Sequence, residues 1–188
     1  MGSEMCIRDR RICDKRICDR ASPKESWQRR IYHTLLVHYG SAPHFRRYQP
    51  DLEDVFTRRW ERLVDLDLHM LSLHLRWFEI KTPVLLASSL ELSGHKTERI
   101  LSLCRAVRAD RYLSGSGGSR HYLDVERLNS AGIRVAWHEF QHPVYPQRYP
   151  ALGFVPHLGA LDLLLNCGPE SSRILRRAQL PEIQSMAR

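Results

Sequence analysis

The first half of the chain carries apolar residues at helical spacing in two long blocks. The block over residues 26–39 ends at Gly40, with a proline shortly after it, which is a typical helix stop. The block over residues 52–78, which begins after Pro50 and Asp51, contains no turn signal, although the alternation of leucine with polar residues at 71–77 also fits a strand. Without a turn signal, one continuous helix is favoured there. We expect the two blocks to form a helical insertion at about residues 26–79.

From residue 83 onward, short apolar runs alternate with segments of helical spacing. The run at 84–87 is typical of a strand that is buried on both faces. A strand that is followed by a helix and another strand implies a right-handed crossover and a parallel sheet. We therefore expect an α/β fold with a Rossmann-like parallel sheet and flanking helices. The expected strands are 84–87, 111–114 and 133–137, and the expected helices are 94–109, 124–132, 158–167 and 171–179.

Composition narrows the class of protein. With 188 residues, of which 43% are hydrophobic, the chain is long enough for one sizeable core. We expect a single domain over residues 21–188. The net charge of +8 is carried by 25 arginines and only four lysines, which are dispersed along the chain. Because no basic stripe with interleaved aromatic residues occurs, we expect no nucleic-acid partner.

The five cysteines argue against a disulfide framework, since their number is odd, and a reducing cytoplasm fits them better. Cys13 and Cys18 have no second pair and no histidine at zinc-ligand spacing, so we expect no metal site. The apolar stretch at 63–80 is interrupted by charged residues and histidines. We therefore expect no membrane insertion and no signal peptide.

The first ten residues resemble one reading frame of a translated sequencing-library adapter. Segments of that origin are set aside before a fold is argued. Residues 11–20 contain a five-residue near-repeat, which is too short to define a repeat architecture. We interpret residues 1–20 as an adapter-like or disordered tail, and we expect that the natural N-terminus of the protein is missing.

Lys96 and Thr97 open a predicted helix that follows a strand. The phosphate-binding P-loop pattern fails here, because His95 separates Gly94 from Lys96 and Ser89 stands where an earlier glycine is needed. A helix N-terminus nevertheless attracts anions. We predict that Lys96 and Thr97 bind an anionic ligand group. The alternative is an ordinary helix start whose lysine lies in water.

A glycine-rich loop follows the predicted strand at 111–114. Ligands of open α/β sheets bind beyond the carboxyl ends of the strands, and glycines allow a close approach of the backbone. We predict ligand contacts in this loop, although an ordinary turn has the same composition. The residues concerned are Ser114, Gly115, Gly117 and Gly118.

His142, Tyr145 and Gln147 lie on a loop that Pro143 and Pro146 keep out of regular helix. A rigidly held histidine is a plausible general base. We predict that these three side chains are catalytic, with His142 as the base and the other two orienting an acceptor. The alternative is that the prolines shape a crossover connection and His142 hydrogen-bonds to its own backbone.

Several blocks in order resemble the WbqC-like family of bacterial proteins: Gly94–Leu101, Tyr112–Gly115, Gly117–Gly118, Phe140–Gln147 and Leu161–Gly168. Members of that family occur among polysaccharide and O-antigen genes. The resemblance implies a transferase that acts on an activated sugar or acyl donor, with Asn166 of the last block also contacting the ligand. The alternative is a non-catalytic binding protein of the same pathway. No cofactor is identified.

The chain departs from that family at its start. Family members begin with a Gln-Pro and Tyr-x-Pro-Trp block and an Asp-x-Val-Gln block, and neither occurs here. Those blocks would supply the opening strands of the sheet. We therefore expect the N-terminal strands to be missing, which would leave an unpaired sheet edge and an incomplete pocket. This chain should then be inactive and prone to aggregate.

Overall fold

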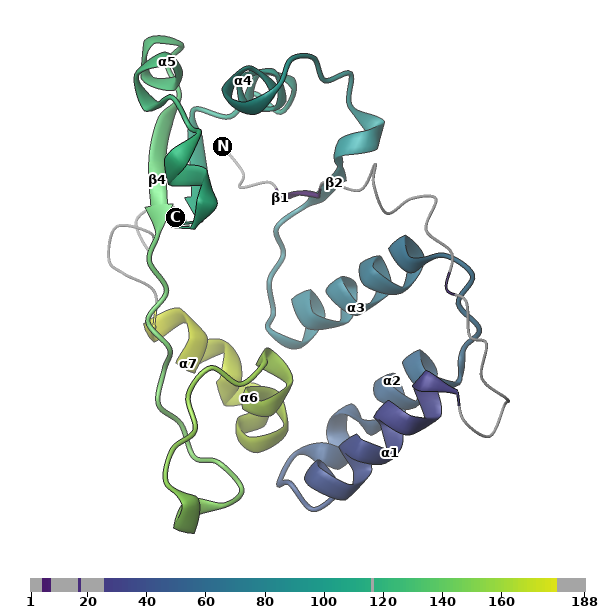
Figure 1. Ribbon diagram of the computed structural model, residues 1–188. Coiled ribbons are helices and arrows are strands. Elements are labelled where there is room, and N and C mark those ends of the chain that lie inside the picture. The colour runs from purple at the N-terminus through teal and green to yellow at the C-terminus, as the bar shows by residue number, and fades with distance from the viewer. Residues whose placement is uncertain (1–4, 8–16, 18–25, 116, 179–188) are drawn as a thin grey trace. The chain divides into compact units, whose positions relative to one another are not determined.

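The computed structural model describes residues 5–7, 17, 26–115 and 117–178 (Figure 1). The chain forms two compact units. Unit 1 comprises the described parts of residues 1–10 and 82–141, and unit 2 comprises the described parts of residues 11–81 and 142–178. The expected single domain spans both units. Most of the expected tail at 1–20, including Cys13 and Cys18, lies outside the described residues.

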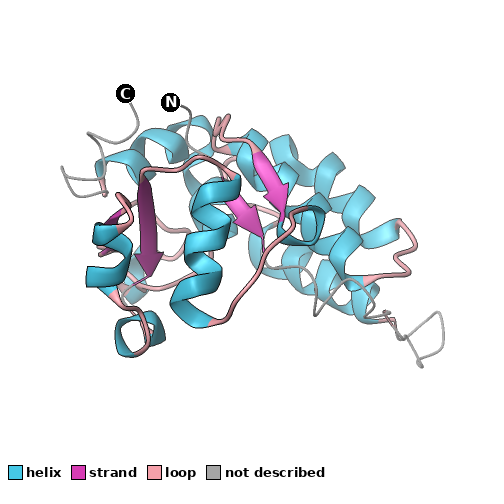
Figure 2. Cartoon of the chain, turned by 90° about the horizontal axis from the view of Figure 1, so that it is seen from above, coloured by secondary structure: helices cyan, strands magenta, loops and turns pink. Residues whose placement is uncertain are grey.

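Unit 1 combines short parallel strands with short helices (Figure 2). Strand β3 pairs with β4 in parallel, from Arg111 opposite Arg134 to Gly115 opposite His138. Strand β1 pairs with β2 in a second parallel sheet, so three residues of the segment that we set aside take part in the fold. The elements are β1 (Met5–Ile7), β2 (Val84–Leu86), η1 (Ala87–Ser89), α4 (Lys96–Ala106), β3 (Arg111–Gly115), η2 (Gly118–His121), α5 (Val125–Ser130) and β4 (Arg134–His138).

The expected α/β character and parallel strand pairing are confirmed in unit 1. The strands of the described residues form two sheets of two strands each, and the larger Rossmann-like sheet stays a prediction. Helix α4 packs an apolar face at helical spacing against α5, whose N-cap Asp124 accepts a hydrogen bond from the Arg127 amide at 2.9 Å. The core of this unit consists of Ile100, Leu101, Cys104, Leu123, Leu128 and Ile133.

Unit 2 is helical. Its elements are α1 (Trp27–Tyr39), α2 (Phe45–Thr57), α3 (Leu63–Trp77), η3 (Pro150–Leu152), α6 (Ala160–Cys167), η4 (Gly168–Glu170) and α7 (Ser171–Arg177). Helices α1 and α2 lie side by side. The expected helices at 26–39, 158–167 and 171–179 correspond to α1, α6 and α7, although Gln179 lies outside the described residues.

The expectation of one continuous helix over residues 52–78 is wrong. Helix α2 begins earlier, at Phe45, and ends before Arg58, whose backbone is extended. Side chains satisfy carbonyls that the end of the helix leaves open: the Trp60 indole nitrogen donates to the Val55 carbonyl at 2.8 Å, and Gln28 Nε2 donates to the Arg58 carbonyl at 2.8 Å. The break is therefore stabilised by contacts that apolar spacing does not reveal.

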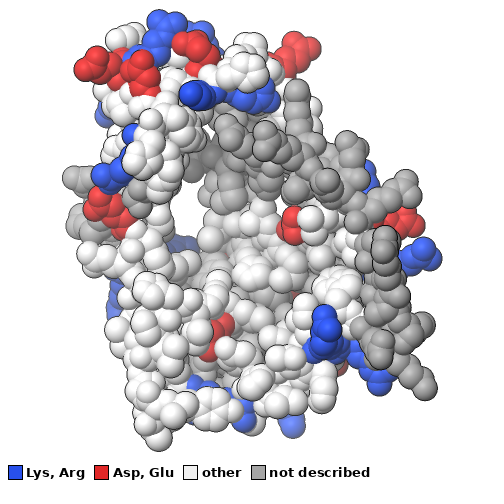
Figure 3. Space-filling view, viewed as in Figure 1, with Lys and Arg blue, Asp and Glu red and all other residues white. Residues whose placement is uncertain are grey.

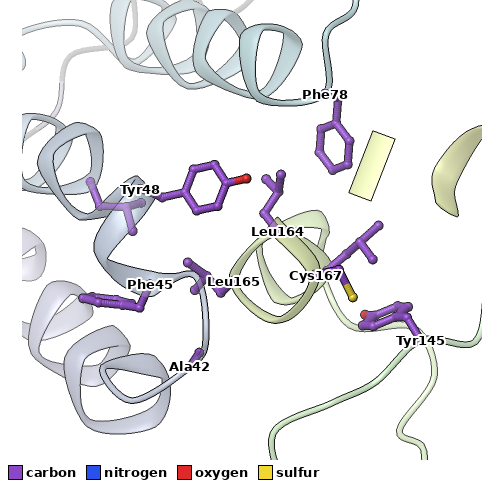
Figure 4. Close-up of a cluster of buried hydrophobic side chains, with 10 residues drawn as sticks. Ala42, Phe45, Tyr48, Phe78, Tyr145, Leu164, Leu165 and Cys167 are labelled. Atoms are coloured by element: carbon purple, nitrogen blue, oxygen red, sulfur yellow. The ribbon is translucent and has the colours of Figure 1, made fainter. Parts of the chain in front are cut away.

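The core of unit 2 forms where α2 meets α6 (Figure 4). Tyr48 of α2 points towards Leu164 of α6, Phe78 approaches from the end of α3, and Phe45 of α2 belongs to the same cluster. Leu164 and Leu165 are fully buried. Helix α6 is apolar on every side except at a few positions, and those polar positions, which include Asp162 and Asn166, are buried as well.

Charged side chains of both signs are scattered over the face of the molecule that Figure 3 shows. None of the helices in the described part of the chain combines the length and the apolar character that a membrane crossing needs. Asp65 lies in the first turn of α3, where it forms an ion pair with Arg62.

Candidate functional site

The predicted site residues divide between the two units. Lys96, Thr97, Ser114, Gly115, Gly117 and Gly118 belong to unit 1, whereas His142, Tyr145, Gln147 and Asn166 belong to unit 2. Each group is described by itself.

In unit 1, Thr97 already has partners within the protein. Its hydroxyl accepts a hydrogen bond from the Asp124 amide at 3.0 Å and lies 3.4 Å from the Tyr122 carbonyl, to which it donates. The side chain is buried and links the start of α4 to the start of α5. Lys96 is exposed and has a positive φ of 48°. Of the two predicted residues, only Lys96 presents its polar group at the surface.

The glycine loop leaves open space at three of its glycines. Among the described residues, no heavy atom lies within 4 Å of the position that a Cβ would take at Gly115, Gly117 or Gly118, and ligand binding by this loop stays a prediction. Ser114 is buried instead, and its hydroxyl donates to the Ser119 hydroxyl at 2.9 Å, which in turn donates to the Gly115 carbonyl at 2.6 Å. Ser114 therefore holds the shape of the loop.

In unit 2, three of the predicted residues converge on one buried carboxylate, that of Asp162. Its Oδ1 accepts from the Tyr39 hydroxyl at 2.9 Å and from Asn166 Nδ2 at 3.1 Å. Its Oδ2 accepts from the Tyr145 hydroxyl at 2.8 Å and from Gln147 Nε2 at 3.1 Å. A carboxylate has about four lone-pair sites, so these four donors saturate it. We call these five side chains the Asp162 cluster.

Local sequence places the members of the cluster. Asp162 lies in the first turn of α6, where the helix dipole favours a negative charge, and Asn166 follows one turn later on the same face. Tyr145 and Gln147 flank Pro146, which keeps that segment out of helix. No Lys, Arg or His within the described ranges forms an ion pair with Asp162, so hydrogen bonds alone compensate its burial.

Gln147 also fixes the neighbouring loop. Its Oε1 accepts from the Val155 amide at 2.8 Å, and its Nε2 donates to the Val155 carbonyl at 3.0 Å. The side chain thereby closes the loop at 148–154 and ties it to Asp162. Gln147 was predicted to be catalytic, and we propose instead that it positions the loop and the Asp162 carboxylate.

A pocket of about 320 Å³ lies against the cluster. Helix α1 and the segment between residues 147 and 162 line it, and most of the lining is apolar. Among the polar residues that line the pocket, Tyr39 and Gln147 each donate a hydrogen bond to Asp162. A concave apolar site with a few convergent polar groups is the usual form of a small-molecule site.

The two tyrosines of the cluster hold their protons firmly. Burial, together with the hydrogen bond to Asp162 and the charge of that carboxylate, raises the pKa of Tyr39 to about 12. Burial and the same carboxylate also raise the pKa of Tyr145. Both phenols are therefore neutral hydrogen-bond donors to Asp162 at neutral pH, and neither serves as a base there.

Stability should fall steeply with pH in the alkaline range. The unfolded chain releases phenol protons near the ordinary pKa of 10.0, whereas folded Tyr39 releases its proton near 12. Between these values the unfolded state binds fewer protons than the folded state, so the free energy of unfolding falls as the pH rises. Urea unfolding at several pH values between 9 and about 12 measures the slope. Tyr145→Phe should make the slope shallower, and an unchanged slope would contradict the assignment.

His142 lies beside the cluster without joining it. Its Nδ1 is 2.9 Å from the Pro143 carbonyl, and its ring centroid lies 6.0 Å from that of Tyr145 and 5.4 Å from that of His157. His142 is not among the residues that line the pocket. The contact with its neighbouring backbone is the one that the alternative interpretation expected, and a catalytic role for His142 stays a prediction.

Asp162 and Tyr39 were not among the site residues that the sequence predicted. The signal for Asp162 was present, because an acidic residue inside the apolar run at 161–165 needs several hydrogen-bond donors if the helix is buried. No local signal identifies Tyr39, which is 123 positions away from Asp162 in the sequence.

Within the described residues, no three His, Cys, Asp or Glu side chains come together in a way that could hold a metal ion. Cys104 and Cys167 are buried and free, and burial raises the pKa of both thiols. A buried thiol with a raised pKa is a poor nucleophile at neutral pH.

Comparison with known proteins gives a family. The model of the WbqC-like protein family matches residues 4–174 of the chain. An uncharacterised protein of Mycobacterium tuberculosis, Rv1507c, is 30% identical over 152 residues, which cover 80% of this chain and 64% of that protein. The chain thus spans less than two thirds of the length of this relative. No solved structure shows a significant match to the chain.

Proposed function

Because the chain belongs to the WbqC-like protein family, we propose that it is a transferase of bacterial cell-surface polysaccharide (O-antigen) biosynthesis that binds part of an activated sugar or acyl donor in the pocket beside Asp162. The observation that carries this proposal is the apolar pocket of about 320 Å³ whose lining includes Tyr39, Gln147 and Asp162 of the Asp162 cluster. Such a site orients a small molecule through a few fixed polar groups.

Each residue of the Asp162 cluster has its own role in the proposed site. Asp162 fixes the orientation of the hydroxyl groups of Tyr39 and Tyr145, because both donate to its carboxylate. Gln147 and Asn166 complete the hydrogen bonding of that carboxylate and keep it in place. Tyr39 lines the pocket, so its oxygen contacts the bound group. In this proposal His142 is the general base. Separately, we propose that Lys96 and the glycine loop bind a phosphate or carboxylate group within unit 1.

The first experiment separates binding from turnover. Thermal-shift measurements on this chain, with nucleotide sugars and acyl-coenzyme A thioesters as probes, should show a donor that raises the melting temperature. Tyr39→Phe should weaken that donor about fivefold, since one hydrogen bond is worth about 1 kcal/mol. The matched control is Tyr32→Phe, which also removes a hydrogen bond from a tyrosine to a carboxylate, that of Glu53, but does not line the pocket.

Turnover is measured on Rv1507c, of whose length the match to this chain covers 64%. Mass spectrometry of reactions that contain donor and acceptor mixtures should detect a transferred sugar or acyl group. Absence of product with Rv1507c, together with a chain that no donor stabilises, would contradict the proposal.

A non-catalytic ligand-binding or accessory role in the same pathway is the second candidate. The observation that favours it is that the polar atoms of Asp162 and Gln147 all have partners within the protein. Thr34, another residue of the lining, donates its hydroxyl to the Arg30 carbonyl at 2.9 Å. Binding of a donor without any product would support this candidate over the transferase.

A further inference from the structure

Arg148 is the only lysine or arginine among the described residues that line the pocket beside Asp162. Its Nη1 donates to the His38 carbonyl and also lies 3.5 Å from the Val37 carbonyl. Within the described part of the chain, its Nη2 and Nε atoms have no hydrogen-bond partner, and its guanidinium forms no ion pair. Because every nitrogen of a guanidinium carries N–H donors, Arg148 brings both a positive charge and available donors to the pocket.

Backbone and ring contacts hold Arg148 in place. Val37 and His38 lie in the last turn of α1, where helix carbonyls lack partners within the helix and the helix dipole favours a positive charge. The guanidinium carbon lies 4.9 Å from the centre of the Tyr149 ring, which also lines the pocket. A side chain that is already fixed loses less conformational entropy when it binds a ligand. An anion would therefore meet a preorganised cation.

The Asp162 carboxylate is the charge that opposes anion binding in this pocket. Asp162 is only 6% exposed, and its carboxylate accepts hydrogen bonds from four side chains. Arg148 is half-buried, so its charge is the more accessible of the two. His38, which is exposed and also lines the pocket, adds a second positive charge when it is protonated. The charges of the lining thus favour an anion at Arg148 over a cation at Asp162.

The rest of the lining favours an apolar body on that anion. Leu35, Leu152, Val155 and Leu158 contribute to it, and Leu152 is 76% exposed. An apolar group against these side chains would remove their surface from water, which stabilises the complex. A small inorganic anion would gain only the charge interaction, and an uncharged alkyl group would gain only the apolar contact. The lining therefore suits a ligand that combines the two.

We infer that the pocket binds an amphiphilic anion, whose carboxylate or phosphate group accepts hydrogen bonds from Arg148 and whose apolar body lies against the leucine and valine side chains. The planar guanidinium fork matches both kinds of anion, since each can accept two of its N–H groups at once. The inference deepens the proposed function, and it rests on that function only in treating this anion as part of a donor.

Alkyl probes that differ in the head group test the inference. Ligand-observed NMR titration of this chain should show binding of hexanoate, hexyl phosphate or both, and the tighter of the two identifies the kind of anion. n-Hexanol and n-hexylamine should bind at least about tenfold more weakly than that anion, because neither brings a negative charge to the guanidinium. Acetate and inorganic phosphate should also bind more weakly, because they lack the alkyl chain. Hexanol that binds as tightly as both alkyl anions would overturn the inference.

Arg148→Met tests the role of the arginine, because methionine keeps an unbranched apolar stem and removes the guanidinium. The change should weaken binding of the preferred anion about tenfold and leave the affinity for hexanol unchanged. Arg58→Met is the matched control, since Arg58 also lies over an aromatic ring, that of Trp60, but outside the pocket. Equal losses for the anion and for hexanol in Arg148→Met would show that the arginine only holds the pocket together, and would contradict the inference.

A pair of threonine variants locates the binding. Thr34 lines the pocket and is exposed on α1, so a bulky residue there should occlude the pocket without entering the core. Thr34→Trp should abolish binding of the preferred anion. Thr57→Trp is the control, because Thr57 is also exposed on a helix and also donates to the carbonyl four residues earlier, but lies outside the pocket. Equal effects of both variants would contradict the location.

The outcomes also separate this inference from the proposed function. If an alkyl anion binds through Arg148 as expected and Rv1507c transfers no group, the transferase proposal fails and the specificity of the pocket stands. If Rv1507c transfers a group and neither alkyl anion binds this chain, the inference alone fails.

Discussion

Replacement of Asp162 by alanine is expected to lower the free energy of unfolding by about 3–5 kcal/mol. The change removes the acceptor for four donors at once. Tyr145 and Asn166 are only 5% and 8% exposed, so water cannot readily replace the carboxylate for them. Each buried donor that is left without a partner costs about 1–3 kcal/mol. Urea unfolding at neutral pH, followed by circular dichroism, measures the loss.

Two further variants test whether the loss of stability in Asp162→Ala comes from the hydrogen bonds of the Asp162 cluster. Asp65→Ala also removes an aspartate from the first turn of a helix in unit 2, but that aspartate pairs with Arg62 at the surface, and its loss should cost less than about 1 kcal/mol. Asp162→Asn keeps the shape but directs an N–H group at other donors, so it should be intermediate. Similar losses for Asp162→Ala and Asp65→Ala would show that the cluster does not stabilise the fold.

Replacement of Gly168 by alanine is expected to lower the free energy of unfolding by about 2–5 kcal/mol. Gly168 follows α6 with a φ of 55°, and a Cβ at this position would lie 2.5 Å from two ring atoms of His44. The His44 amide donates to the Leu165 carbonyl at 3.1 Å, so its backbone is anchored and cannot easily withdraw the ring. Backbone strain and steric overlap therefore add together, and urea unfolding again gives the loss.

Gly153→Ala is the matched control for Gly168→Ala. Gly153 has a φ of 73°, but no heavy atom lies within 4 Å of the position of its Cβ, so the change should cost only the strain, about 1–2 kcal/mol. His44→Ala should recover part of the loss in the double variant with Gly168→Ala, because the overlapping ring is gone. If the losses of His44→Ala and Gly168→Ala simply add, the close approach is not the cause.

Local patterns in the sequence predicted most of the individual elements. The strands expected at 111–114 and 133–137 correspond to β3 and β4, and the helix expected at 26–39 corresponds to α1. The helical spacing of apolar residues did not reveal the boundary between α2 and α3, because both helices repeat apolar residues at the same period. The break depends on the indole of Trp60 and the amide of Gln28, whose bonds to α2 carbonyls form only in the folded chain.

The candidate site was only partly predictable for a related reason. Prolines marked the segment that holds Tyr145 and Gln147, and the family resemblance pointed to Asn166. The residue that joins them, Asp162, and the tyrosine that completes the pocket, Tyr39, come from different helices. A sequence pattern reports neighbours along one element, whereas a buried carboxylate collects its donors from several.

The hydrogen bonds of Gln147 restrict the movement of the loop at 148–154. The Gln147 side-chain amide forms two hydrogen bonds with the Val155 backbone and a third with Asp162. The loop at 148–154, which carries Tyr149 and Leu152 of the pocket wall, therefore cannot swing away from the base of the pocket unless Gln147 releases one of these partners. Movement of the loop at 148–154 and the hydrogen bonding of the Asp162 carboxylate are therefore coupled through the Gln147 side chain.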